Sequence, residues 1–179
     1  MRIERSPGII TNTVNGVTQV LPSRQDDFIF NNWEEGKNET SIGMRGGKNF
    51  TFSPKGGPSD TVYKVVEYDH DQMVKEWEID VSKVDAYNAT CVEMWALSIY
   101  TDDHGITKDF RFRIDSAFSS VYGTENKSAY MEAETNFYEA LKTLMEADKR
   151  EGFYQHYLSV KSFFDYYDKK EKGVPSRLL

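Results

Sequence analysis

The sequence predicts an α+β fold in which an antiparallel β-sheet from the N-terminal two-thirds packs against a C-terminal helical hairpin. Apolar residues alternate with polar ones in short segments up to residue 114, whereas after residue 128 they recur with the 3.6-residue period of a helix. The regular alternation of strands and helices that builds a parallel sheet is missing. The 179 residues fit one domain, β-rich over 1–120 and with the helical hairpin over 127–172.

The first expected elements are β-hairpins. Asn15-Gly16 separates two β-rich runs, and this dipeptide suits the left-handed positions of a type I′ turn. Short strands are expected over 41–44 and 49–53, where glycines punctuate the chain. A further hairpin is expected from the period of two and from the turn-forming residues between its strands, which are 61–68 and 73–80 with a turn over 69–72.

Residues 82–114 are expected to add a short helix and two strands. Ser82 and Asp85 have the spacing of a capping box, which predicts a helix over 83–89. The apolar run that follows favours a buried strand over 93–101. The alternative is a longer helix, because Val84, Tyr87, Cys91, Met94 and Trp95 fall at helical spacing. Phe110, Phe112 and Ile114 alternate with charged residues, which predicts a half-buried strand paired with 93–101.

Two amphipathic helices are expected at the C-terminus. The first begins near Ser128, and Gly152 ends it. Its apolar stripe consists of Tyr130, Ala133, Phe137, Leu141 and Leu144. The second stripe consists of Phe153, Tyr157, Val160, Phe164 and Tyr167.

Three aromatic residues fall away from the second stripe: Tyr154, Phe163 and Tyr166. Aromatic side chains beyond those that a core can absorb are typical anchors of protein interfaces. The alternative is that both faces of this helix are buried within the domain. The sequence therefore predicts Tyr154, Phe163 and Tyr166 as interface residues, with burial in the core as the competing interpretation.

The charge of the chain is uneven. The net charge is −7, and residues 60–120 alone carry thirteen acidic and six basic side chains. This balance repels a phosphate backbone, so nucleic acid is not an expected partner. Exposed carboxylates would instead steer the protein toward a basic partner. The acidic residues predicted at the interface are Glu76, Glu78, Asp102 and Asp103.

Cys91 is the only cysteine, and its apolar neighbours are more typical of a core residue than of a catalytic thiol. A lone cysteine and the absence of an apolar signal segment near the N-terminus predict a cytoplasmic location. No run of 18 apolar residues is present, so no membrane association is expected.

Two histidines beside carboxylates are the candidates for catalysis. His70 lies between Asp69 and Asp71, and His104 directly follows Asp103. A histidine next to a carboxylate can act as a general base, and if both turns lay on one edge of the sheet they would form a single rim. The competing interpretation is that aspartate and histidine are ordinary turn residues here.

A basic, glycine-rich stretch supplies the candidates for phosphate binding, which are Arg45 and Lys48. The P-loop pattern fails, because Asn49 follows Gly47-Lys48 and Ile42 stands where the first glycine belongs. A flexible hairpin loop is the simpler interpretation. No metal-ligand spacing such as HExxH or CxxC occurs, so the sequence predicts neither a metal site nor a cofactor.

Three functions are compatible with these features. The leading hypothesis is a small acidic protein-binding module of the kind found among inhibitors, immunity proteins and phage-encoded antagonists, an analogy of composition. The second is a small hydrolase or nuclease-like toxin that uses His70, His104 and Asp103 on a turn-rich rim. The third is a subunit of a larger assembly, which predicts a homo-oligomer. The lack of an intact catalytic motif argues against an enzyme.

Overall fold

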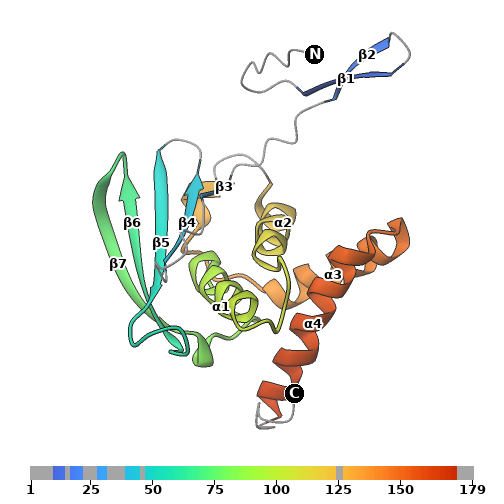
Figure 1. The fold of residues 1–179 in the computed structure, drawn as a ribbon. Coiled ribbons are helices and arrows are strands. Elements are labelled where there is room, and N and C mark those ends of the chain that lie inside the picture. The colour runs from blue at the N-terminus through green and yellow to red at the C-terminus, as the bar shows by residue number, and fades with distance from the viewer. Residues whose placement is uncertain are drawn as a thin grey trace.

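The computed structural model describes residues 10–14, 17–21, 28–31, 39–44, 47–123 and 127–172. Within these residues the strands come first and the helices follow (Figure 1), which confirms the predicted α+β class. Two strands, β1 (Ile10–Val14) and β2 (Val17–Leu21), pair antiparallel around the predicted Asn-Gly position. This pairing confirms the expected N-terminal hairpin.

A five-stranded antiparallel sheet forms the centre of the β region. Its spatial order, β3-β4-β5-β6-β7, follows the chain, so each strand pairs with the next. The predicted strands near 41–44, 49–53, 61–68 and 73–80 are all confirmed. The observed bounds are β3 (Phe28–Asn31), β4 (Thr40–Met44), β5 (Lys48–Pro54), β6 (Val62–Asp69) and β7 (Gln72–Asp80).

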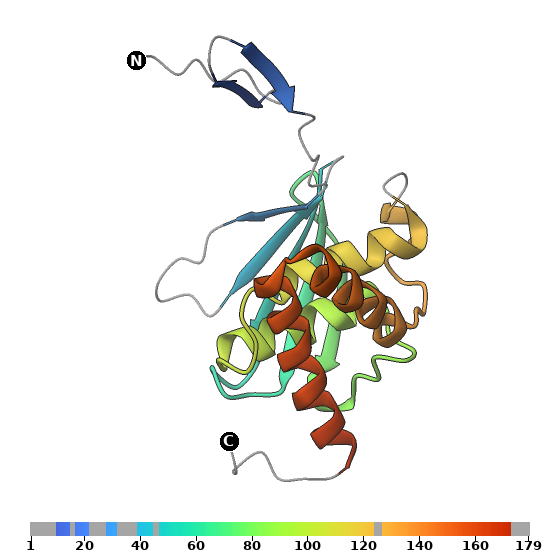
Figure 2. The same ribbon diagram turned by 90° about the vertical axis from the view of Figure 1, so that its right-hand side faces the viewer.

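The two faces of the sheet differ because successive side chains point to opposite sides. Phe50 and Phe52 of β5 are buried on the inner face, and both rings lie against Trp95. On the outer face, Lys64 of β6 and Glu76 of β7 are exposed and form an ion pair at 2.8 Å. All the helices lie on the inner side of the sheet (Figures 1 and 2).

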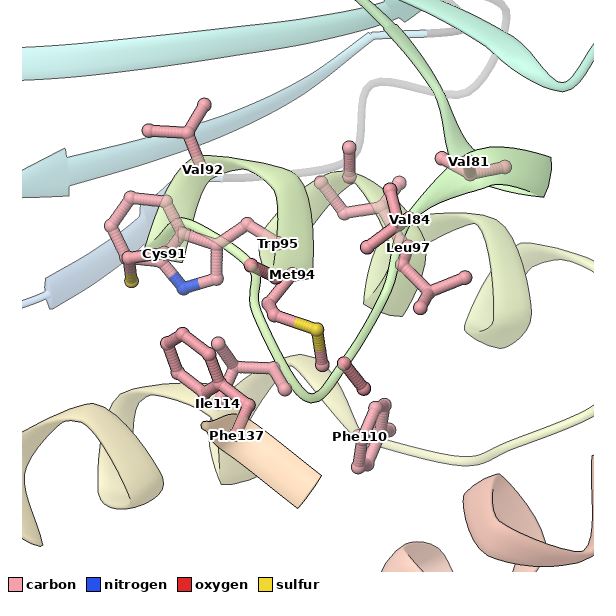
Figure 3. Close-up of a cluster of buried hydrophobic side chains, with 14 of the residues drawn as sticks. Val81, Val84, Cys91, Val92, Met94, Trp95, Leu97, Phe110, Ile114 and Phe137 are labelled. Atoms are coloured by element: carbon pink, nitrogen blue, oxygen red, sulfur yellow. The ribbon is translucent and has the colours of Figure 1, made fainter. Parts of the chain in front are cut away.

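Helix α1 (Cys91–Asp103) occupies the place where the sequence predicted a helix over 83–89 and a strand over 93–101. Both predictions are wrong: 81–83 is only a short 3₁₀ turn, η1 (Val81–Lys83), and the capping box uses Thr90 and Glu93. Helix α1 is buried on nearly every side, between the strands and the later helices (Figure 3). A helix that is apolar all round shows no amphipathic period. This absence of periodicity explains the misassignment.

Helix α2 (Arg111–Tyr122) replaces the strand predicted over 110–114. The alternation of Phe110, Phe112 and Ile114 was misleading, because Phe112 is exposed in the structure. The buried residues instead follow helical spacing: Phe110, Ile114, Ala117 and Phe118.

The predicted C-terminal helices are present, and they pack as the last layer of the fold. They are α3 (Phe137–Glu151) and α4 (Tyr154–Glu171). The first helix begins later than predicted, since 127–130 form a 3₁₀ turn, η2 (Lys127–Tyr130). Gly152 ends α3 in a left-handed conformation, as expected. The helical part therefore contains α1 and α2 as well as the hairpin. None of the described helices is both long and apolar enough to cross a lipid bilayer.

Candidate functional site

The two candidate histidines lie at opposite ends of the sheet. His70 occupies the β6–β7 turn, where its backbone N–H donates to the carbonyl of Gly47. His104 directly follows Asp103, the last residue of α1. Asp103 lines a cleft together with Tyr63, which lies near the start of β6. The six residue-to-residue steps from Tyr63 to Asp69 span about 20 Å. The condition for a shared catalytic rim, two turns on one edge, is therefore not met.

Each histidine also has a local role. His70 Nδ1 lies 2.6 Å from a carboxylate oxygen of Asp69, and both side chains are exposed. His104 Nδ1 lies 2.8 Å from the carbonyl oxygen of Tyr100, within its own helical turn. Among the described residues, no group of three or more histidine, cysteine, aspartate or glutamate side chains is placed to hold a metal ion.

Of the two phosphate-binding candidates, Arg45 lies outside the described residues. Lys48 is described, and its Nζ lies 2.6 Å from Glu67 Oε1. Because the Glu67 side chain is almost completely buried, this ion pair stabilises a carboxylate on the inner face of the sheet. Lys48 is thus already engaged with an anion of the protein itself.

The acidic residues predicted on β7 are exposed, but each is paired with a lysine. Glu76 pairs with Lys64 at 2.8 Å, and Glu78 pairs with Lys55 at 2.6 Å. These ion pairs neutralise much of the field that a row of carboxylates would create. The outer face of the sheet is consequently less acidic than its sequence suggests.

Asp102, predicted at the interface, is a structural residue. Its side chain is 5% exposed. Its carboxylate accepts hydrogen bonds from the backbone N–H groups of Phe110 and Arg111, the Thr107 hydroxyl and Arg111 Nε. The carboxylate therefore caps α2 from the end of α1. The prediction that Asp102 faces a partner is wrong, because the fold uses the whole carboxylate.

Asp103 lies on a cleft of about 180 Å³ between the sheet and the end of α1, which we call the acidic cleft. Three antiparallel strands contribute their ends: the start of β4, the end of β5 and the start of β6. The apolar walls are Phe52, Pro54, Pro58 and Ile99. The titratable groups are Glu39, Tyr63 and Asp103.

The polar groups of the acidic cleft are incompletely partnered. Asp103 Oδ1 lies 3.2 Å from Arg111 Nη2, but the same guanidinium also serves Asp102. Glu39 is exposed and makes no hydrogen bond or ion pair with the described part of the chain. Tyr63 is 1% exposed and lines the cleft, yet its hydroxyl has no hydrogen-bond partner among the described residues.

The cleft perturbs two of its acids, the buried Tyr63 and Asp103, whose side chain is 37% exposed. Burial raises the pKa of the Asp103 carboxyl above its ordinary value, although the Arg111 guanidinium acts in the opposite direction. Burial, followed by the negative charge of Asp103, raises the pKa of the Tyr63 phenol. The phenol is therefore protonated at neutral pH. An added positive charge would relieve the unfavourable environment of the Asp103 carboxylate.

A second cleft, of about 160 Å³, lies near the other end of α1, and we call it the ion-paired cleft. Its charged lining residues are Lys48, Glu67 and Glu132. Lys48 pairs with Glu67, and Glu132 pairs with Lys75 from β7. All three charged groups that line this cleft are thus matched within the protein.

The aromatic interface candidates on α4 have different environments. Phe163 is fully buried and stacks on Phe110 with ring centroids 4.4 Å apart, so its prediction as an interface residue is wrong. Tyr166 is partly buried against the core, and burial raises its pKa. Tyr154 is 64% exposed and lies near the exposed Phe153 and Leu158 at the start of α4.

No family model, curated protein or solved structure matches this chain. The candidate site consequently rests on geometry. The structure brings Asp103, a sequence candidate, together with Glu39 and Tyr63, which sequence reasoning missed. Glu39 precedes β4 and Tyr63 lies in a β-rich run, and neither position carries a local signal of function. Glu39, Tyr63 and Asp103 come together only in the folded chain, where the strand ends lie beside the end of α1.

Proposed function

We propose that this protein is a small acidic binding module that docks on a partner protein with a basic surface, in the manner of an inhibitor, an immunity protein or a phage-encoded antagonist. The observation that carries the proposal is the acidic cleft, where Glu39 and the Tyr63 hydroxyl lack partners among the described residues. Glu39 is exposed, whereas the Tyr63 side chain is buried, and buried polar groups are normally hydrogen-bonded. A basic group from a second molecule would supply the missing donor.

The size of the acidic cleft favours a side chain over a free cofactor. Its volume of about 180 Å³ is below the range of about 300–1,000 Å³ that is usual for small-molecule sites. A cleft of this size suits a single long side chain that a larger partner presents. Such an arrangement is typical of an anchor residue in a protein interface.

Exposed apolar residues elsewhere support the class of protein-binding modules. Phe153, Tyr154 and Leu158 lie at the junction of α3 and α4, which extends away from the sheet (Figure 1). We call these three residues the aromatic tip. Exposed apolar clusters of this kind mark contact surfaces in soluble proteins. The end of α3 beside the tip carries Lys149, Arg150 and Glu151, which is not a net acidic set, so the basic partner is assigned to the acidic cleft.

Capture of partners by the full chain tests the proposal. Tagged wild type, a Glu39→Gln/Tyr63→Phe double variant and a Tyr68→Phe control would be incubated in parallel with lysate of the source cells, followed by quantitative mass spectrometry. Tyr68 is a matched control because it lies on β6 but on the other face of the sheet.

The expected result is a protein that wild type and the Tyr68→Phe control retain and the double variant loses about tenfold or more. Its retention should also fall when salt rises from about 0.1 M to about 0.5 M, because charge attraction is screened. Equal retention by the double variant would contradict the proposal. Capture of this chain alone, with self-association in light scattering, would favour a subunit of an assembly instead.

A further inference from the structure

The acidic cleft combines apolar walls with acceptor groups in one small space. We infer that it binds the guanidinium group of an arginine side chain that the partner protein presents. The identification of the source as a protein rests on the proposed function. The assignment of the guanidinium group rests on the cleft alone.

The apolar walls match the stem of a long basic side chain. Phe52 and Ile99 come from the inner face of the sheet and from α1, and Pro54 and Pro58 lie at the end of β5 and in the following loop. Arginine and lysine bury their methylene groups on such surfaces while the charged head reaches polar atoms. The walls therefore favour a cationic side chain over a compact inorganic ion.

The acceptors come from three separate elements. Glu39 precedes β4, Tyr63 belongs to β6 and Asp103 ends α1. The Glu39 carboxylate and the Tyr63 hydroxyl are without hydrogen-bond partners in the described part of the chain. Arg111 occupies one oxygen of Asp103. A planar guanidinium offers five N–H donors in a fork and can reach several acceptors at once.

The partly buried setting favours arginine over lysine. A guanidinium is more weakly hydrated than an ammonium group and stacks on aromatic faces, so it loses less on entering a cleft with a phenylalanine and a tyrosine in its walls. A metal ion is a poorer fit, because no cluster of three or more metal-ligating side chains occurs among the described residues. The molecule already holds one guanidinium beside Asp102 and Asp103, that of Arg111.

Titration of the full chain with capped tripeptides tests the inference by heteronuclear NMR. The probes are acetyl-Gly-Arg-Gly-amide, its lysine analogue, its neutral citrulline analogue and free arginine. The arginine peptide should give saturable shifts at the amides of Thr40, Tyr63 and Asp103, with a dissociation constant on the order of 1 mM. Lysine should bind about threefold or more weakly, and citrulline should not saturate.

Variants locate the binding. Tyr63→Phe removes only the hydroxyl and should weaken the arginine peptide about three- to tenfold, the loss expected for one hydrogen bond. Tyr68→Phe should leave the affinity unchanged. Circular dichroism of both variants would verify that the fold is intact. An unchanged affinity in Tyr63→Phe would overturn the assignment of the acidic cleft.

The remaining outcomes are distinct. Equal or tighter binding of lysine would overturn the guanidinium preference, and saturation by citrulline would overturn the role of charge. Tighter binding of free arginine than of the capped peptide would overturn the protein source. Binding of the arginine peptide without any cleft-dependent partner in lysate would leave the inferred chemistry supported and the proposed function contradicted.

Discussion

The two clefts between the sheet and α1 differ in how their charges are partnered. In the ion-paired cleft, Lys48 neutralises the buried Glu67, and Lys75 pairs with Glu132. In the acidic cleft, one guanidinium is shared between Asp102 and Asp103, and Glu39 makes no contact with a cation in the described residues. Because folding favours matched buried charges, the pairing in the first cleft stabilises the fold. The incompletely partnered carboxylates of the second cleft are the basis of the proposed binding.

The comparison also holds between neighbours in the chain. Asp102 and Asp103 are adjacent, yet the carboxylate of Asp102 accepts four hydrogen bonds, whereas that of Asp103 accepts one, from Arg111, among the described residues. Composition alone treats these residues as equivalent. Their different positions at the end of α1 give one a structural role and leave the other on the acidic cleft.

The largest expected effect comes from removing the carboxylate that the fold uses fully. Asp102→Ala leaves the first N–H groups of α2 and the Arg111 guanidinium without their acceptor. The expected loss in the free energy of unfolding is about 3 kcal/mol. Urea denaturation would measure it, with Asp103→Ala as the matched control. If both variants lost the same free energy of unfolding, Asp102 and Asp103 would not differ in their structural roles.

The next effect tests the ion-paired cleft. Lys48→Met leaves the Glu67 carboxylate without its cation on the inner face of the sheet. We expect a loss of about 2 kcal/mol, moderated because Lys48 itself is one-third exposed. The Lys48→Met/Glu67→Leu double variant should recover at least half of this loss in urea denaturation. A neutral single variant would show that the pair is dispensable.

Strands β4 and β5 were predictable because each has one buried face. In β5, Phe50 and Phe52 face the core while their neighbours are partly exposed, and this alternation is visible in the sequence. Helix α4 was predictable in the same way from its 3.6-residue period. In β5 and α4 a single buried face produced a local pattern that the sequence shows.

Helices α1 and α2 were misassigned because their determinants are not local. Helix α1 is buried on nearly every side, which removes the period. The first N–H groups of α2 are satisfied by Asp102, eight and nine residues before Phe110 and Arg111, so no local cap marks its start. The acidic cleft was unpredictable for the same reason, since Glu39, Tyr63 and Asp103 meet only in the folded chain.

A smaller effect is expected from the pH dependence of Asp103. Burial raises the pKa of this carboxyl in the folded protein, so the fold keeps the proton at pH values where the unfolded chain has lost it. Its contribution to stability therefore falls as pH rises from about 3.9, the ordinary aspartate pKa, through the raised value. The difference in the free energy of unfolding between wild type and Asp103→Asn should decrease over this range.

Urea denaturation of wild type and Asp103→Asn, from about pH 4 to about pH 7, would measure that difference. The same shift applies to binding: affinity for the arginine peptide should fall on acidification at a higher pH than an ordinary aspartate pKa would give. A difference in stability that stays flat with pH would mean that Asp103 is as well solvated as an exposed residue. The contrast with Asp102 would then depend on hydrogen bonds alone.

The smallest effect is expected at the aromatic tip, outside both clefts. Tyr154 is the most exposed residue of the tip and forms no ring contact with the described residues. Tyr154→Ser should change the free energy of unfolding by less than about 0.5 kcal/mol and leave the affinity for the arginine peptide unchanged. Thermal denaturation and the same NMR titration would measure both. A loss above about 1 kcal/mol would show that the side chain packs on the fold. A change in peptide affinity would mean that arginine recognition extends beyond the acidic cleft. The groups without partners in that cleft would then not be sufficient to define the binding site.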